Sequence, residues 1–260
     1  MKRFFDDVKN YWTYTKYAAK SELKSEVANK HWGWLWWLLD PLLFMIVYSF
    51  VAAVVFKKSE QYLAAFIFIG LSCWNFFQNT LKNSVKVVSG NSSIVTKVYI
   101  PKYMLVVQEM LINGFKMLIS LGFVAIMMVM YRVPLTYRVV YAIPLFLILF
   151  VVTFGLSTLA LHGGVFIEDL ANALNAFLRL LFYFSGVFYS LSKRVPNPYG
   201  QILLKCNPVA MIMDGLRSCV LYSSDPDFKW MLIWLCIGLA VSVFGVRTIY
   251  KNENTYVKVI

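Results

Sequence analysis

Long apolar runs separated by short polar segments divide the chain into six stretches of membrane-spanning length. We expect spans at about 34–56, 62–81, 103–131, 139–161, 170–191 and 228–250. A helix needs about 20 predominantly apolar residues to cross the hydrocarbon core of a bilayer. A membrane β-barrel would instead show alternating segments of about ten residues. The pattern therefore predicts an all-α membrane protein with six transmembrane helices and a single transmembrane domain over residues 34–260.

Residues 1–33 have the character of a helix that lies on a membrane surface. Lys16, Lys20 and Lys24 recur at intervals of four, which places them on one ridge of a helix beside apolar positions. We therefore expect a cytoplasmic amphipathic interface segment at 1–33, with a solvated tail as the alternative.

Tryptophans mark the entry into the first apolar run, at positions 32, 34, 36 and 37. Indole rings suit the headgroup boundary, because the N–H stays hydrated while the body of the ring is apolar. The following pair, Asp40-Pro41, favours a helix that begins there, since Asp caps helices and Pro fits their first turn. Residues 41–56 alone are short for a span, so the Trp-rich turn is expected to belong to it.

The polar segment NSSIVTKVYIP, between the second and third spans, predicts a short helix capped at Asn91 or Ser92 and ended by Pro101. A cytoplasmic partner protein could bind a short amphipathic helix placed between two spans. An ordinary basic loop is the alternative.

Residues 191–228 are too polar for one span and too apolar for a plain loop. They are expected to form two short amphipathic helices broken at Asn207-Pro208. A re-entrant helical hairpin at the outer leaflet explains this pattern, because irregular backbone at membrane depth must face protein or water. A surface-lying hairpin is the alternative.

Lysine and arginine set the orientation. The side that holds both termini and the 82–116 segment carries fifteen of these residues, against nine on the other side. Cytoplasmic loops carry the excess of positive charge, so both termini are expected in the cytoplasm.

Composition excludes several functions. The chain is 60% hydrophobic and only 15% charged, whereas soluble domains carry about 25% charged residues. The net charge of +12 is attributed to contacts with anionic lipid headgroups rather than with nucleic acid. The sequence has no GxxxxGK[ST] motif, no HExxH or GxSxG motif, and no Cys/His cluster, so neither an ATPase site nor a metal site is expected in this chain. We find no repeated halves or mid-membrane ion ligands of a secondary transporter.

Four motifs in chain order resemble those of type-2 ABC exporter permeases, specifically the polysaccharide branch that includes O-antigen, capsule and teichoic acid exporters. The entry of the first span is similar at Gly33, Leu35, Trp36, Pro41, Tyr48 and Phe50. GLSCWNFFQNTL is similar at Gly70, Leu71, Trp74, Phe76 and Phe77. NSSIVTKVYIPKY resembles the cytoplasmic coupling helix with its following Pro101, and CNPVAMIMDGLR resembles the outer re-entrant region at Asn207, Pro208 and Arg217. The chain departs from the family pattern at Glu168-Asp169, where Arg-Asp is common, and at Gly186, where a proline is common.

The resemblance implies a transport subunit that is not itself an enzyme. Such permeases form homodimers with a pore at the interface, and two copies of a separate ABC ATPase subunit, which bind ATP and Mg, dock from the cytoplasm. The chain itself would hold no cofactor. The implied substrate is an undecaprenyl-diphosphate-linked polysaccharide or related glycopolymer, moved across the bacterial cytoplasmic membrane to the outer leaflet.

Site residues follow from this resemblance together with the chemistry of sugars, which stack on aromatic rings and form hydrogen bonds. Candidates for the substrate pathway are Trp74, Phe76, Phe77, Arg179, Tyr183, Phe184, Phe188 and Tyr189. Candidates for the diphosphate headgroup are Arg179, Lys193 and Arg194. The ATPase contact is expected at Ser92, Ser93, Ile94, Val95, Thr96, Lys97 and Tyr99. For each pathway residue the alternative is contact with lipid or another helix, and for the cations it is snorkelling to the headgroups.

Two other functions remain open from the sequence. A type-2 ABC permease for a drug or small lipid would share the fold. A membrane enzyme or scaffold outside the ABC class would need no ATPase partner.

Overall fold

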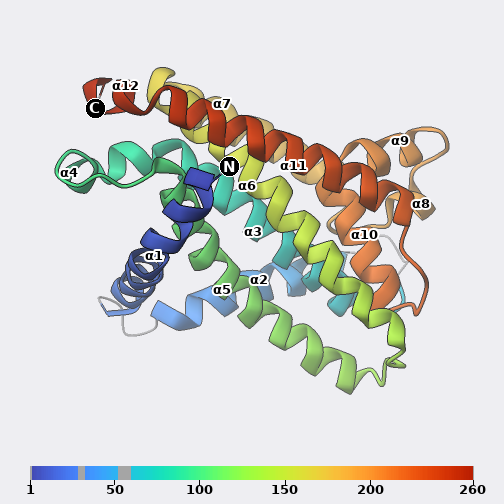
Figure 1. The fold of residues 1–260 in the computed structure, drawn as a ribbon. Helices are drawn as coiled ribbons and strands as arrows, with labels where there is room; N and C mark the ends of the chain where they lie inside the picture. Colours follow the sequence, from blue (N-terminus) through green and yellow to red (C-terminus); the bar gives the residue numbers. More distant parts are fainter. Residues whose placement is uncertain (1, 29–32, 52–59, 260) are drawn as a thin grey trace.

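The computed structural model describes residues 2–28, 33–51 and 60–259, and within them every regular element is a helix. The elements are α1 (Lys2–Ala28), α2 (Gly33–Phe50), α3 (Leu63–Gly90), α4 (Ser92–Val95), α5 (Lys102–Met130), η2 (Tyr137–Tyr141), α6 (Ala142–Phe166), α7 (Leu170–Phe184), α8 (Leu191–Arg194), α9 (Tyr199–Cys206), α10 (Pro208–Val220), α11 (Phe228–Lys251) and α12 (Glu253–Val259). Figure 1 shows α4 and α12 at one end of the long helices and α8 and α9 at the other.

Among the described residues, three helices are long and apolar enough to cross a membrane: Lys102–Met130, Tyr137–Phe166 and Phe228–Lys251. Leu35–Phe50 and Leu170–Phe184 are shorter apolar helices. The predicted all-helical membrane class is therefore confirmed.

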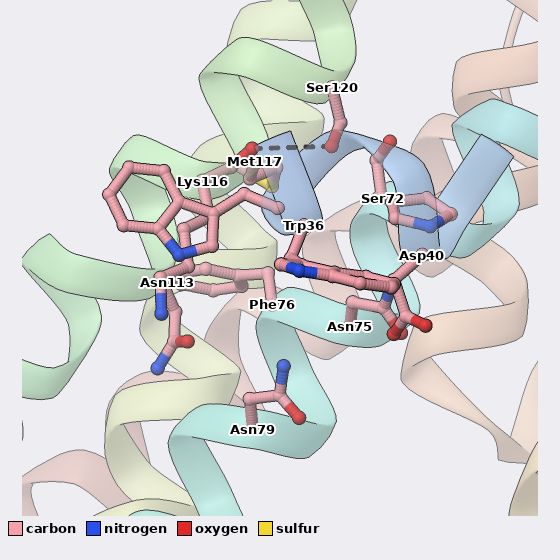
Figure 2. Close-up of a pocket in the computed structure, with 12 residues that line it drawn as sticks. Trp36, Asp40, Ser72, Asn75, Phe76, Asn79, Asn113, Lys116, Met117 and Ser120 are labelled. Atoms are coloured by element: carbon pink, nitrogen blue, oxygen red, sulfur yellow. Dashed lines mark hydrogen bonds between the residues drawn. The ribbon is translucent and has the colours of Figure 1, made fainter. Parts of the chain in front are cut away.

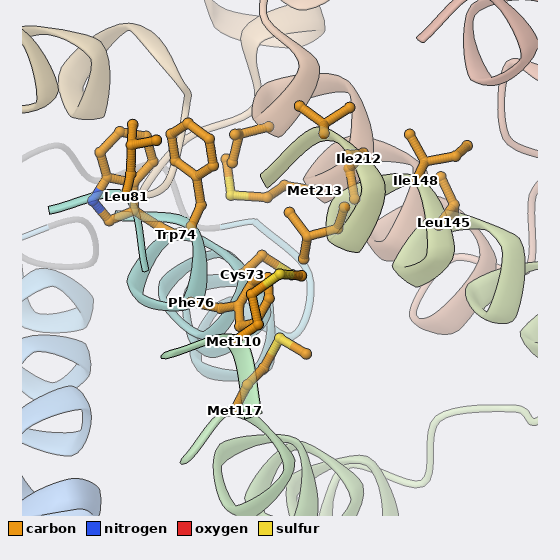
Figure 3. Close-up of a cluster of buried hydrophobic side chains, with 14 of the residues drawn as sticks. Cys73, Trp74, Phe76, Leu81, Met110, Met117, Leu145, Ile148, Ile212 and Met213 are labelled. Atoms are coloured by element: carbon orange, nitrogen blue, oxygen red, sulfur yellow. The ribbon is translucent and has the colours of Figure 1, made fainter. Parts of the chain in front are cut away.

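Helix α3 is the centre of the bundle. Every residue from Ala65 to Trp74 is buried, so this stretch has no exposed face. It packs against α5 and α6 and, less extensively, against α2, α7 and α10. Figure 3 shows part of the resulting core, with Phe76 of α3 near Met110 of α5. A helix that is apolar all round is typical of a protein core or of a membrane span.

Three helices differ in length from the predicted spans. Helix α6 continues past the predicted end at 161 to Phe166. Helix α3 continues past the predicted end at 81 to Gly90, so the first part of the polar 82–102 segment is helical. Helix α7 ends at Phe184, before the predicted end at 191, and residues 185–190 are not helical. Helices α5 and α11 coincide closely with the runs at 103–131 and 228–250.

Helix α2 begins at Gly33, so it includes the Trp-rich turn as expected, but Asp40 does not cap it and Pro41 lies in its interior rather than in its first turn. A proline inside a helix deprives the carbonyl four residues earlier, here that of Trp37, of its amide partner. Membrane helices tolerate this loss where neighbouring groups satisfy the carbonyl. Residues 52–56 of the predicted first span lie outside the described residues.

Helices α6 and α11 approach each other closely through small residues. Gly155 of α6 lies against Ser242 of α11, and Gly245 of α11 lies against Thr158 of α6. The Ser242 hydroxyl donates a hydrogen bond to the carbonyl of Val151 across the interface, at 3.1 Å. Small residues allow the close helix packing that holds membrane helices together where no hydrophobic effect acts between them.

Candidate functional site

The hairpin of α9 and α10 breaks at Asn207-Pro208, as predicted, and Asn207 holds the break in place. Its side-chain oxygen accepts hydrogen bonds from the backbone N–H of Val209 and Ala210, at 3.0 and 3.3 Å. Its amide nitrogen donates to the hydroxyl of Ser185 at 2.8 Å. Pro208 fits the first turn of α10, where no amide hydrogen is needed. The cap thus joins the start of α10 to the end of α7.

Arg217 of α10 is a buried cation whose side chain is only 3% exposed. Its guanidinium donates to three backbone carbonyls, those of Phe66 at 3.1 Å, Gly186 at 2.9 Å and Val187 at 2.7 Å. It also lies 3.5 Å from the centre of the Phe66 ring. The Arg217 side chain therefore ties α3 to the non-helical segment that follows α7, and it satisfies the carbonyls of Gly186 and Val187, which lie outside any helix.

Two glycines make room for this arrangement. Gly186 has a φ of +65°, a conformation that costs glycine little, and it turns the chain after α7. Any side chain at Gly70 would collide with the Arg217 guanidinium. The glycine in the GLSCW motif is thus explained by the space that the arginine occupies.

The predicted pathway residues fall into two groups. Trp74, Phe76 and Phe77 are buried inside the chain, and the Trp74 indole N–H donates to Gln78 Oε1 at 2.7 Å. The other five lie on α7 and the segment after it. Arg179, Tyr183 and Phe184 are exposed, while Phe188 and Tyr189 are partly buried.

The partly buried pair is held by local contacts. The Phe188 ring stacks on Tyr48 of α2 with ring centres 3.3 Å apart, and the Tyr189 hydroxyl donates to the carbonyl of Tyr183 at 2.8 Å. Phe182 of α7 connects the two groups, because its ring centre lies 5.4 Å from that of Trp74 and 5.1 Å from that of Phe188.

The predicted headgroup cations Lys193 and Arg194 share one carboxylate. Glu60 lies 3.0 Å from Lys193 Nζ and 3.4 Å from Arg194 Nε, and its own side chain is 8% exposed. Both cations therefore have an internal counter-ion, whereas Arg179 is exposed on α7.

The predicted coupling segment at 92–99 forms only one helical turn, α4, followed by a turn. Val95 is 4% exposed and faces the protein. Ile94, Val98 and Tyr99 are 39%, 55% and 47% exposed, which leaves an apolar patch on this end of the molecule. We call Ile94, Val98 and Tyr99 the coupling patch.

Arg3 connects the coupling patch to both ends of the chain. Its guanidinium donates to the Tyr99 hydroxyl at 2.6 Å and to Glu253 Oε2 of α12 at 2.9 Å. It also lies 4.4 Å from the centre of the Tyr250 ring. The bond to Tyr99 raises the pKa of Arg3, and burial raises the pKa of Tyr99 to about 12, so the phenol stays protonated at neutral pH. The two ends of the chain therefore lie on the same side of the bundle as α4.

Replacing Arg3 with alanine should loosen α12 without unfolding the bundle. The side chain is 57% exposed, so its ion pair with Glu253 contributes about 1 kcal/mol or less. We expect faster hydrogen–deuterium exchange in residues 253–256 and an unchanged melting temperature. Lys9→Ala, at another exposed position of α1, is the control. Unchanged exchange in α12 would show that Arg3 does not hold it.

A polar cleft of about 230 Å³ lies between α2, α3 and α5. Its lining residues are Trp36, Trp37, Asp40, Pro41, Ser72, Asn75, Phe76, Asn79, Asn113, Lys116, Met117 and Ser120. Figure 2 shows the Trp36 ring lying across the cleft, with Asp40 and Asn75 on one side and Asn79 and Asn113 below. Of the predicted site residues, only Phe76 lines this cleft.

Helix α1 supplies the counter-ion for Lys116, one of the residues that line the cleft. Glu26 of α1 lies 2.8 Å from Lys116 Nζ and also accepts a hydrogen bond from the Trp37 indole at 2.9 Å. Sequence reasoning missed this site, although a signal is present. Asn75 and Asn79 are four residues apart in α3, and Asn113, Lys116 and Ser120 recur on one face of α5.

Over the described part of the chain, no three His, Cys, Asp or Glu side chains gather as a metal site would require. The polar groups of the cleft are amides, hydroxyls, one carboxylate and one paired amine, which suits reversible binding of a hydroxylated ligand.

Comparison with known proteins identifies relatives over nearly the whole chain. Residues 14–221 match the family model described as "ABC-2 type transporter". An O-antigen export system permease protein RfbA of Klebsiella pneumoniae is 23% identical over 243 residues, which cover 93% of each protein. The protein of the same name from Myxococcus xanthus is 26% identical over 236 residues, which cover 91% of this chain and 90% of the relative.

Proposed function

Since the chain belongs to the ABC-2 type transporter family, we propose that it is the permease subunit of an ATP-driven exporter that moves a lipid-linked polysaccharide across the bacterial cytoplasmic membrane. The observation that carries the proposal is the family match over 14–221, together with relatives that are named as O-antigen export permeases. In this proposal the glycopolymer is attached to undecaprenyl diphosphate, as in O-antigen, capsule or teichoic acid export.

The proposed topology has six spans, formed by α2, α3, α5, η2 with α6, α7, and α11. Both termini and α4 lie in the cytoplasm, and α8 to α10 form a re-entrant hairpin at the outer leaflet. The excess of lysine and arginine on the side of the termini supports this orientation. The contact of Arg3 with Glu253 supports a shared side for both ends.

Two copies of the chain are proposed to form the pore, with α7 facing the partner copy. Helix α7 presents large apolar and aromatic side chains outward, among them Phe177, Leu180, Tyr183 and Phe184, which are 52% to 63% exposed. Tyr183, Phe184, Phe188 and Tyr189 are the proposed pathway surface, with Arg179 as the accessible cation for the diphosphate. Trp74, Phe76 and Phe77 support this wall from inside the protomer. Lys193 and Arg194 would exchange Glu60 for the diphosphate only at the cost of breaking two ion pairs.

Two copies of a separate ABC ATPase, which bind ATP and Mg, are proposed to dock on the segment at 92–99. The supporting observation is the coupling patch, because exposed apolar groups on a loop mark a protein contact. Ile94 and Val98 are one helical turn apart, and the Val98 N–H donates to the Ile94 carbonyl at 2.9 Å. Their side chains can therefore enter one groove of a partner.

The test is purification of the tagged chain from its native membranes, followed by identification of any ATPase that co-purifies. We expect an ABC ATPase with the native chain and its loss with Ile94→Asp combined with Val98→Asp, since neither side chain supports the core. Ile167→Asp is the control, because Ile167 is also exposed, in the connection between α6 and α7. Absence of any ATPase from the native preparation, even after crosslinking, would overturn the exporter function and favour a membrane enzyme or scaffold.

A further inference from the structure

The cleft between α2, α3 and α5 contains polar groups without partners. Asn75 and Asn79 lie on successive turns of α3 and are partly buried, and neither side chain forms a hydrogen bond with another described residue. Trp36 and Asp40 line the same cleft and are exposed, and neither the Trp36 indole N–H nor the Asp40 carboxylate forms a hydrogen bond with another described residue. Polar groups inside a membrane domain are costly unless they meet a partner or water. Their convergence on one cleft indicates a polar ligand.

The charges of the cleft exclude a phosphate group as the preferred ligand. Lys116 is the single cation among its lining residues, and Glu26 neutralises it at 2.8 Å. Asp40 adds a negative charge that forms no ion pair with another described residue. A diphosphate would meet a carboxylate and no free cation, whereas hydroxyl groups can donate to Asp40 and exchange hydrogen bonds with the asparagine amides.

We propose that this cleft binds one sugar unit of the exported glycan, an assignment that rests on the proposed function. Asn75 and Asn79 hydrogen-bond the sugar hydroxyls, Asp40 accepts from one of them, and the face of Trp36 covers the apolar side of the sugar ring. Trp36 is 54% exposed and lies across the cleft in Figure 2, so its ring is available for stacking. Cavities for drug-sized ligands measure about 300–1,000 Å³. The smaller volume of about 230 Å³ fits one unit rather than a whole repeat.

The test uses the complete exporter, chain plus ATPase, in lipid nanodiscs. The first probe is the lipid-linked glycan extracted from cells that lack this chain, and the second is undecaprenyl diphosphate without sugar. The measurement is the probe concentration that gives half-maximal stimulation of ATP hydrolysis. We expect Asn75→Ala and Asn79→Ala each to raise that concentration for the glycan about fivefold, the loss of one hydrogen bond. The concentration of the sugar-free lipid that gives half-maximal stimulation should not change.

Asn10→Ala removes an exposed amide on α1, outside both the cleft and the proposed pathway, and is the matched control. Trp36→Ala should weaken the response to the glycan and Trp36→Phe should restore most of it, because stacking needs a ring. Glycan responses in the Asn75 and Asn79 variants equal to that of Asn10→Ala would overturn the sugar site while leaving the exporter function intact. An equal shift for the sugar-free lipid would show that the cleft binds the lipid diphosphate instead. A native complex that no lipid-linked glycan stimulates would overturn the proposed substrate and the sugar site together.

Discussion

Replacing Arg217 with methionine is expected to leave little folded protein. The side chain is buried, and its removal takes a donor from the carbonyls of Gly186 and Val187, which lie outside any helix, and breaks the bond to the Phe66 carbonyl of α3. A buried acceptor left without a donor costs about 1–3 kcal/mol. We therefore expect a loss of about 3–5 kcal/mol in the free energy of unfolding, comparable to breaking a buried ion pair.

The measurement is the fraction of protein that remains monodisperse after heating in detergent, followed by size-exclusion chromatography. A loss of this size should lower the melting temperature by roughly 10 °C. Arg217→Lys should be intermediate, since an ammonium carries three donors but lacks the planar fork that reaches carbonyls on two segments. Arg247→Met, at an exposed position of α11, is the control. A melting temperature for Arg217→Met equal to that of the control would show that the three carbonyls find other donors.

Replacing Gly155 with leucine should separate α6 from α11 and prevent stable folding. A Cβ at Gly155 would lie 2.9 Å from both the backbone nitrogen and the hydroxyl of Ser242. Because one of these atoms belongs to the backbone of α11, the helix itself must move. Overpacking costs typically about 1–3 kcal/mol, and more where the backbone cannot yield. The displacement also breaks the hydrogen bond from Ser242 to Val151.

Gly122→Leu provides a matched control in α5, where nothing lies within 4 Å of a Cβ at that position. The comparison is the yield of monodisperse protein and its melting temperature. We expect Gly155→Leu to be lost or strongly destabilised and Gly122→Leu to stay close to the native value. If the two variants behave alike, the close approach of α6 and α11 is not what stabilises the bundle.

The apolar runs of the sequence predicted the bounds of α5 and α11 well. Helices α5 and α11 begin and end almost where the hydrophobic pattern changes, because lipid accepts a backbone only when its polar groups are satisfied within the helix. The break at Asn207-Pro208 was also readable, since Asn is a strong cap and Pro a strong first-turn residue. The same rule failed at Asp40-Pro41, where the apolar Trp-rich turn continues the helix.

The candidate site was less predictable. An aromatic motif does not indicate which ring faces a pathway and which faces a neighbouring helix. Trp74 and Phe77 are buried because other helices surround α3. The cleft was missed because its polar residues come from three helices. Asn75 and Asn79 lie within the GLSCWNFFQNTL motif, but the prediction followed the aromatic positions of that motif.

The sequence by itself determined the membrane class, the resemblance to a family of exporters, the positions of the long helices and the hairpin break, because these follow from composition and local chemistry. Only the tertiary structure decided where α7 ends, which aromatic residues are exposed, which cations have counter-ions, and that Asn75, Asn79 and Trp36 share a cleft. The physical reason is that each of these depends on atoms contributed by distant segments. The end of α7 depends on donors from Arg217 and Asn207, more than 20 residues further along the chain.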